Sequence, residues 1–475
     1  MRRVLVFVSL FLALFALRAQ TPPALSPEVK AFVTLDAPVM ALTHVRVIDG
    51  TGAPARDDQT IVISGGKIKA IGNAETIPIP AEAKVIELRN YTVIPGLVGM
   101  HNHIFYPAGP AHYNTLAFSA PRLYLACGVT TIRTTGSLEP YTELNLKKAI
   151  NEGRVPGPKM HVTSPYLEGR GAFTLQMHEL TGPEDARKMV AYWAEQGVDD
   201  FKAYTNITKA ELAAAIEEVH KRGLKITGHL CSVGFREAAA LGIDNLEHGI
   251  LTDSEFVADK KADICPGGRQ AREALLKLNV TGPEIQETIR VLVENKVAVT
   301  STLPVFEISV PGRPPLQQRV LDVMAQDMRI AYLTQRARVG EAGATPAPAL
   351  LKKEMDFERE FVKAGGLLIA GPDPTGYGGV VPGFGDQRGV QLLVEAGFTP
   401  EEVIKIATHN GALYLGQLDR IGTLAAGKQA DMVLIKGNPA KNIADIEKVE
   451  TVFKDGIGYD SAKLIEAIRG TVGIR

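Results

Sequence analysis

Four histidines, one lysine and one aspartate follow apolar segments of this chain, and together they have the chemistry of a metal-binding hydrolytic centre. They are His101, His103, Lys202, His229, His248 and Asp373. Residues two apart on a strand point to the same side, so His101 and His103 can bind one ion. One such pair is more often structural, but an apolar segment followed by a ligand recurs at 229, 248 and 373. The recurrence favours a two-metal site, for which imidazole is a suitable ligand.

Lys202 fits such a site only in a neutral or modified form, because an ammonium group repels metal ions and has no lone pair. Burial near cations lowers the pKa of a lysine, and the neutral amine can add carbon dioxide to form a carbamate that bridges two ions. The alternative is an ordinary lysine that lies at a strand end or pairs with Asp199 or Asp200. The segment GVDDFKAY by itself favours this alternative.

Six separate motifs occur in the order in which a known family has them. They are PGLVGMHNH at 95–103, DFKAY at 200–204, GH at 228–229, IDNLEHG at 243–249, AGPD at 370–373 and GTLAAGKQADMVLIKGNP at 422–439. On these motifs the chain resembles the amidohydrolase superfamily, in particular the prolidase-like and imidazolonepropionase-like members of its binuclear branch. The resemblance runs from about residue 40 to the C-terminus. Gly99 and Pro372 replace an Asp and a Thr that many relatives carry beside the ligands, which affects metal tuning rather than the ligand set.

The resemblance also implies the roles of the candidate residues. Two divalent ions, with zinc as the expected metal, would be held by His101, His103 and Asp373 on the more buried side, by a bridging carbamate on Lys202, and by His229 and His248 on the other side. A water between ions about 3.5–4 Å apart supplies hydroxide, and Asp373 would pass its proton to the leaving nitrogen as general acid and base. Tyr204 lies two residues beyond Lys202, and it either assists the oxyanion or a substrate carboxylate, or is a rim aromatic without a role.

The central part of the chain alternates strand-like runs with helical patterns. The runs include GVTTIRTT, KMHVTSP, DDFKAY, LKITGH, VAVTSTLPV and GLLIAG. Helical stretches begin at the capping-box pairs Thr208 with Glu211 and Thr399 with Glu402. This alternation predicts a parallel (β/α)8 barrel of the TIM type. All six candidate ligands fall at the C-terminal strand ends, where such barrels carry their catalytic groups.

Both ends of the chain show β-strand patterns. TIVISGGKIKAIG alternates apolar and polar residues around a two-residue hairpin signal at Gly65 and Gly66, and ADMVLIKG and VETVFKDGIGYD repeat the pattern near the C-terminus. The fold class is therefore α/β. By resemblance, residues 94–414 form the barrel, and residues 20–93 with 415–475 form a small composite β-sandwich.

Two connections, 251–296 and 306–363, are too long for simple links and are expected to carry helices of their own. Part of 306–363 is either a lid over the site or decoration on the outside of the barrel. The three cysteines, Cys127, Cys231 and Cys265, allow at most one disulfide. The thiol of Cys231 could face the metals, but the favoured interpretation is a small buried hydrophobic side chain.

The composition is that of a globular protein that acts on small molecules. The 475 residues are 45% hydrophobic and 22% charged, with a net charge of −1. The sequence has no basic stripe of the kind that binds nucleic acid. Arg2 and Arg3 precede an apolar stretch that ends at Leu17, so residues 1–19 are expected to be a signal peptide. This predicts an exported enzyme, periplasmic or secreted, without stable membrane association. An uncleaved anchor is the alternative, although the stretch is short for a span.

Three functions are consistent with these residues. The first is a metal-dependent amidohydrolase that cleaves amide bonds of dipeptides, N-acyl amino acids or related small amides. The second uses the same scaffold on a cyclic amide, a lactone or an aryl ester. The third is a non-catalytic exported binding protein, which is disfavoured because all six ligands are present. A homo-oligomer is also compatible with the sequence.

Overall fold

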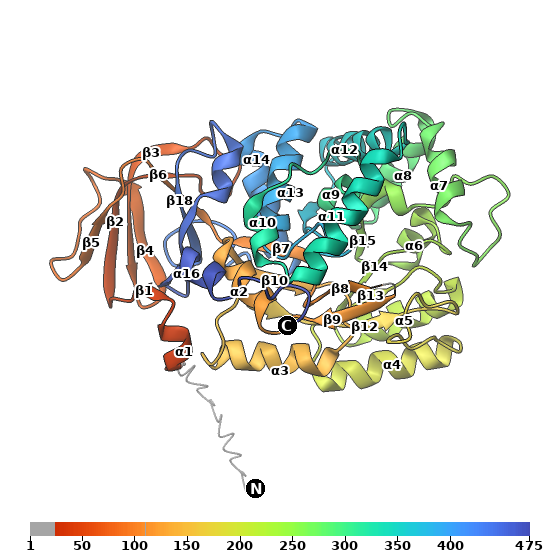
Figure 1. Cartoon of the computed structure of the whole chain (residues 1–475), viewed down its shortest axis with the longest axis horizontal. Helices are drawn as coiled ribbons and strands as arrows, with labels where there is room; N and C mark the ends of the chain where they lie inside the picture. The colour runs from red at the N-terminus through yellow and green to blue at the C-terminus, as the bar shows by residue number, and fades with distance from the viewer. Residues whose placement is uncertain (1–23, 110) are drawn as a thin grey trace, which may run out of the picture.

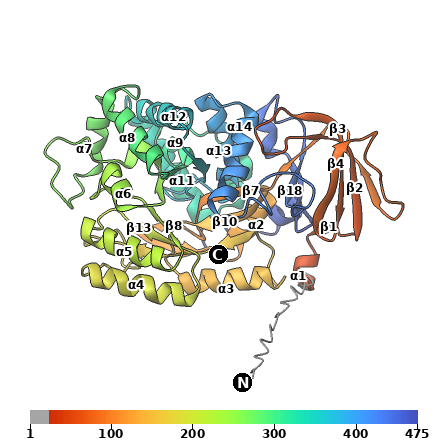
Figure 2. The same cartoon turned by 180° about the vertical axis from the view of Figure 1, so that it is seen from behind.

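The computed structural model describes residues 24–109 and 111–475 (Figure 1). The predicted signal peptide at residues 1–19 lies outside the described residues. No described helix is long and apolar enough to cross a bilayer. A sheet-rich part lies at one end of the molecule, beside a larger part in which helices surround parallel strands (Figures 1 and 2).

The sheet-rich part unites strands from both ends of the chain in one nine-stranded sheet. Its strand order is β1 (Val33–Leu35), β20 (Ile457–Asp460), β19 (Val449–Lys454), β18 (Met432–Lys436), β6 (Tyr91–Pro95), β2 (Val39–Val47), β3 (Arg56–Ser64) and β4 (Lys67–Asn73), with β5 (Lys84–Glu87) paired to β2. The predicted hairpin is confirmed, because Gly65 and Gly66 join β3 to β4 with φ values of +57° and +73°. Strand β6 continues through Gly96 into the first parallel strand, so the sheet is joined directly to the candidate site.

The larger part contains two parallel sheets. The first has the order β11 (Lys159–His161), β10 (Val129–Thr134), β7 (Leu97–Asn102), and the second has β12 (Thr163–Leu167), β13 (Asp200–Ala203), β14 (Lys225–Gly228), β15 (Asn245–Glu247), β16 (Ala298–Ser301), β17 (Leu368–Ala370). Only Val162 separates β11 from β12. Just beyond β17, the N–H of Asp373 donates to the carbonyl of His101 in β7 at 3.0 Å. This hydrogen bond links the segment after the last parallel strand to the first one.

Helices connect the parallel strands and cover them on the outside. They include α2 (Ser119–Ala126), α3 (Pro140–Asn151), α4 (Pro183–Gln196), α5 (Lys209–Lys221), α6 (Phe235–Leu241), α13 (Phe384–Ala396), α14 (Pro400–Lys405) and α15 (Gly411–Tyr414). Both predicted capping boxes are confirmed, at Thr208 for α5 and at Thr399 for α14. On α5, Leu212, Ile216 and Val219 form one buried stripe, which stabilises the fold by about 1.5–3 kcal/mol for each side chain.

Both long connections carry helices, as predicted. The first connection contains the end of η1 (Gly249–Thr252), and α7 (Gly268–Leu276) and α8 (Pro283–Glu294). The second begins within the last residues of α9 (Leu303–Glu307) and contains α10 (Gln318–Val323), α11 (Gln326–Glu341) and α12 (Ala347–Lys363). Helices α8, α9 and α12 lie on the side of the molecule opposite to α3, α4 and α5 (Figures 1 and 2). The remaining elements are α1 (Pro27–Lys30), the hairpin β8 (Phe105–Gly109) and β9 (His112–Thr115), η2 (Ile406–Asn410), η3 (Ile443–Glu447) and α16 (Ser461–Glu466).

The last residues of the chain return to the larger part. Helix α16 contacts α2, and the N–H of Val472 donates to the carbonyl of Val323 at 2.9 Å. The side chain of Asn114 in β9 donates to the carbonyl of Gly473 at 2.8 Å. The C-terminus therefore ties the helical layer to the β8–β9 hairpin.

Candidate metal centre

All seven candidate residues line one pocket of about 550 Å³. They are His101, His103, Lys202, Tyr204, His229, His248 and Asp373. Each lies near or just beyond the C-terminal end of a parallel strand, namely β7, β13, β14, β15 or β17. The structure therefore brings together residues that are up to 272 positions apart in the chain.

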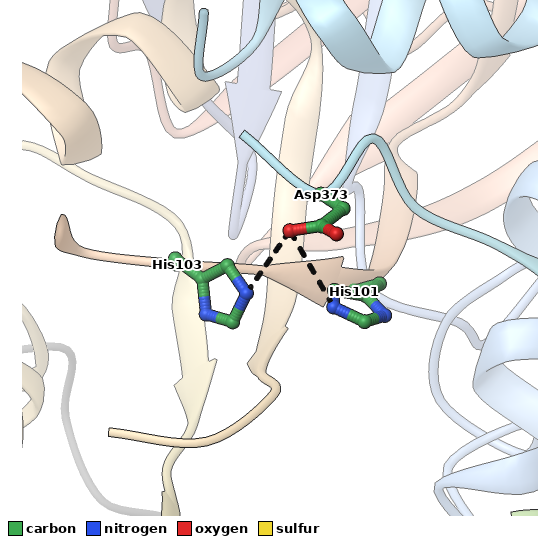
Figure 3. Close-up of side chains that lie close together, drawn as sticks. All are labelled: His101, His103 and Asp373. Atoms are coloured by element: carbon green, nitrogen blue, oxygen red, sulfur yellow. Dashed lines mark ion pairs between the residues drawn. The ribbon is translucent and has the colours of Figure 1, made fainter. Parts of the chain in front are cut away.

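The tightest cluster consists of His101, His103 and Asp373 (Figure 3). Asp373 Oδ1 lies 3.3 Å from His103 Nε2 and 3.7 Å from His101 Nε2. One ligand atom of each residue lies within 4.8 Å of the others, so the three can share one ion. Asn102 turns away, and its Nδ2 donates to Asp386 Oδ1 in α13 at 3.0 Å. This is the alternation that the HxH spacing predicts.

His229 and His248 extend the cluster on one side. Their ring centroids are 4.3 Å apart, and the His248 ring lies 4.6 Å from the His101 ring. His248 Nδ1 lies 2.8 Å from the hydroxyl of Thr302, and when Nδ1 donates in this contact, Nε2 keeps the lone pair that can bind an ion. His248 has a φ of +69°, so the chain turns sharply where β15 ends.

Lys202 lies inside this cluster and not in solvent. Its side chain is 1% exposed, and Nζ has no hydrogen-bond partner among the described residues. Glu247 Oε1 is 4.0 Å away, and Asp199, one of the two expected partners, pairs instead with Lys147 at 2.6 Å. Burial lowers the pKa of Lys202 to about 8, although the charge of Glu247 opposes the shift. The amine therefore loses its proton more readily than an exposed lysine does.

Burial also sets the protonation states of the other groups. It lowers the pKa of His103 to about 4 and that of His229 to about 3, so both rings are neutral near pH 7 and keep a lone pair. Burial acts to raise the pKa of Asp373, but the charge of His101 and the hydrogen bond from His103 outweigh it and hold that pKa below its usual range. Burial raises the pKa of Tyr204 well above 10, so its phenol remains a hydrogen-bond donor.

Glu247 is a functional residue that sequence reasoning missed, although it stands in the motif IDNLEHG. Its Oε2 lies 2.7 Å from His101 Nδ1, and its Oε1 accepts from Arg133 Nη2 at 2.7 Å and from the hydroxyl of Thr227. Burial acts to raise the pKa of Glu247, but Lys202 and Arg133 hold it well below its usual range. A carboxylate on Nδ1 fixes the tautomer in which Nε2 of His101 is free for an ion.

Apolar and aromatic side chains form the walls of the pocket above these groups. They include Phe105, Tyr113, Tyr166, Phe173, Leu251, Val305 and Phe306. The connection 251–296 adds Cys265, Gly268, Ala271 and Arg272, whereas no residue of 307–363, all of which the structure describes, lines the pocket.

Cys231 is buried, as the favoured interpretation has it, but it is not a separate small side chain, because it forms a disulfide with Cys265. The Cα atoms are 4.9 Å apart, since the loop after β14 and the segment before α7 meet at the pocket. The prediction of at most one disulfide is confirmed, and Cys127 is a buried free thiol.

The model of the amidohydrolase family matches residues 92–265 and 378–457, more than half of the chain. The chain belongs to the amidohydrolase family. Enamidase from Eubacterium barkeri is 23% identical over 430 residues, which cover 85% of this chain and 90% of the relative. Imidazolonepropionase from Herpetosiphon aurantiacus is 21% identical over 429 residues, 82% of this chain and 89% of the relative. The crystal structure of a Xaa-Pro dipeptidase with bound methionine matches with a TM-score of 0.65 and 20% identity, over 89% of this chain and 100% of that chain.

This amidohydrolase is therefore a hydrolase that acts on C–N bonds, and the predicted resemblance is confirmed. Amidohydrolases are generally metal-dependent, and the donors of this site fit divalent cations. Imidazole nitrogens and a carboxylate converge, and two buried atoms, His103 Nδ1 and Lys202 Nζ, have no hydrogen-bond partner in the part of the chain that the structure describes. A cation and an added carboxylate would satisfy a set of this kind.

Proposed function

We propose that the protein is a binuclear metal-dependent hydrolase that cleaves amide bonds of dipeptides, N-acyl amino acids or related small amides. The observation that carries the proposal is the convergence of six ligand-type side chains on one largely buried pocket. In this proposal His101, His103 and Asp373 would hold one ion, His229 and His248 would hold the other, and Lys202, as a carbamate, would supply oxygen ligands to both. Zinc is the expected metal, because neutral imidazole and carboxylate suit it.

When bound, the two ions supply an activated water and polarise the scissile carbonyl group. Asp373 is the residue that would move the proton, because it stays an ionised carboxylate among the candidate ligands, and its oxygens can accept the proton and deliver it to the leaving nitrogen. The hydroxyl of Thr375 donates to Asp373 Oδ1 at 2.8 Å and orients the carboxylate. Tyr204 keeps its phenolic proton and can donate it in a hydrogen bond to the developing oxyanion.

The carbamate is proposed because the buried amine of Lys202 has no partner of its own. The neutral amine adds carbon dioxide, a new N–C bond forms, and the nitrogen releases one proton. The product is a carbamate anion with two oxygens, and it replaces the lysine ammonium at the same position. An anion with ligand oxygens fits beside imidazoles that burial keeps neutral.

We also propose how the chain is divided into domains. Residues 94–414 would form a closed (β/α)8 barrel, supported by the hydrogen bond from Asp373 to His101 that joins the last strand to the first. Residues 20–93 and 415–475 would form the composite sandwich domain, supported by the pairing of β18 with β6. Residues 1–19 would direct export to the periplasm or the medium, supported by the arginines and the apolar stretch of the N-terminus.

The test combines elemental analysis of the purified protein with a substrate panel of dipeptides, N-acyl amino acids, cyclic amides and lactones. We expect about two metal ions per chain and hydrolysis of the linear amides. Asp373→Asn and Lys202→Ala should be inactive, whereas the exposed controls Asp419→Asn and Lys441→Ala should match the wild type. A metal-free active protein, or full activity of Lys202→Ala, would contradict the proposal.

A further inference from the structure

The turn that carries His248 rests against Glu354, one of two buried glutamates for which the proposed mechanism has no role. Glu354 and Glu358 lie one helical turn apart on α12, and both are 0% exposed. Glu354 Oε2 accepts the N–H of Leu251 at 3.0 Å. Helix α12 belongs to the long connection 306–363, and no residue of the helix lines the pocket. It therefore contacts the turn after His248 on the side away from the pocket.

His248 has a backbone conformation that needs support. The φ values are +69° for His248 and +61° for Gly249, and a non-glycine residue stays in this left-handed region only where its surroundings fix it. Element η1 begins directly after His248, and the first N–H groups of any helix have no partner within it. Glu354 supplies the acceptor for one of these groups, the N–H of Leu251.

Gly249 shows how closely α12 approaches this turn. A Cβ atom on Gly249 would overlap Oε1 of Glu354, so a side chain at position 249 would require the Glu354 carboxyl group to move. Burial, together with the charge of Glu358, raises the pKa of Glu354 well above its usual range. Glutamine is uncharged and keeps one acceptor oxygen, so it is the closest substitute for this buried carboxyl group.

We infer that Glu354 is a positioning residue for His248. It holds the backbone of η1 from behind, while Thr302 holds the imidazole through Nδ1 at 2.8 Å. With both contacts in place, the His248 ring stays 4.3 Å from the His229 ring at the pocket. The inference rests on the proposed function in one respect, which is that His248 is a metal ligand.

The variants are Glu354→Ala, which removes the acceptor, and Glu354→Gln, which keeps an oxygen in the same place. Glu358→Ala is the matched control, because Glu358 is equally buried on the same helix and accepts no hydrogen bond from η1 in the described structure. If Glu354→Ala fails to fold, Glu354→Met fills a similar volume without an acceptor and replaces it in the comparison.

The first measurement is hydrogen exchange at the amide of Leu251 in metal-free protein. Glu354→Ala should exchange at least about tenfold faster than the wild type, and Glu354→Gln and Glu358→Ala should stay close to it. The second is chelator competition for the two ions. Glu354→Ala should bind one of them about 10–100-fold more weakly, with Glu354→Gln restoring the affinity. In turnover, kcat of Glu354→Ala should fall while KM stays near the wild-type value.

Wild-type exchange at Leu251 in Glu354→Ala, or equal effects of Glu354→Ala and Glu358→Ala on exchange and ion affinity, would overturn the inference. A wild-type protein that binds no metal would contradict the proposed function instead. The exchange experiment would still decide whether Glu354 holds the turn, so the two failures are distinguishable.

Discussion

Replacement of Glu247 tests the electrostatics of the site most directly. Glu247→Gln keeps the shape of the side chain and one oxygen that can accept from Arg133, but it puts an NH2 group where Oε2 now lies 2.7 Å from His101 Nδ1. Nδ1 must then accept a hydrogen bond, so the ring proton moves to Nε2, the nitrogen that faces Asp373. His101 would lose the lone pair with which it is proposed to bind an ion. We expect a folded protein with about 10–100-fold weaker metal binding.

Glu247→Ala should also destabilise the protein, because Arg133 is 0% exposed and would lose its carboxylate at 2.7 Å. Breaking a buried pair in this way costs about 3–5 kcal/mol. Arg133 keeps acceptors at Asn245 Oδ1 (2.8 Å) and the carbonyl of Met100 (2.7 Å), which places the loss near the lower end, about 3 kcal/mol. A chain of this length has an unfolding entropy on the order of 1 kcal/mol per kelvin, so Tm should fall by about 3 °C.

Calorimetry of the metal-free proteins measures the change in Tm, and elemental analysis after dialysis against a chelator measures the retained metal. Glu143→Gln is the matched control, because Glu143 is 2% exposed and lies outside the pocket. The reasoning about the His101 tautomer would be refuted if Glu247→Gln retained as much metal as the wild type and Glu143→Gln. If Glu247→Ala melted at the wild-type temperature, Arg133 would not depend on this carboxylate.

Two further predictions concern the disulfide and a buried acid. Cys231 and Cys265 are 34 residues apart, so the loop-entropy model assigns their bond about 3–4 kcal/mol. A Cys231→Ser, Cys265→Ser double variant should melt about 3–4 °C lower and have a higher KM, because both residues line the pocket; an unchanged Tm would contradict this. Burial raises the pKa of Glu143 from 4.5 to about 8, so its stabilisation is complete below pH 4.5 and is lost as the pH rises to 8. In urea titrations the wild type should lose roughly 4 kcal/mol over this window relative to Glu143→Gln, and parallel curves would exclude the effect.

The convergence of His101 and His103 could be predicted because a local sequence pattern encodes it. His101 and His103 share one face of β7, and Asn102 points the other way to Asp386. The hairpin at Gly65 and Gly66 and the helix starts at Thr208 and Thr399 also depend on contacts between residues that are close in sequence. In each case the structure is decided by neighbours within about four residues, which a single sequence displays.

Contacts between distant segments could not be predicted in this way. Arg133 and Glu247 are 114 residues apart, and no local pattern shows that the two side chains pair. The signal that could have found it is physical, because a metal-binding imidazole needs an acceptor for its second nitrogen, and a carboxylate next to a predicted ligand is a candidate. Cys265 lies in an irregular segment, so its approach to Cys231 depends on how the connection 251–296 folds over the pocket.

His248 shows where strand alternation alone gives the wrong side chain direction. Asn245 and Glu247, two apart on β15, face the enclosed interior, where both contact Arg133. If the strand continued, the next residue would face outward, away from the other ligands. The left-handed backbone of His248 turns its ring back to within 4.6 Å of the His101 ring. Two adjacent residues can therefore serve the same site, with His248 at the pocket and Glu247 behind the ligand His101.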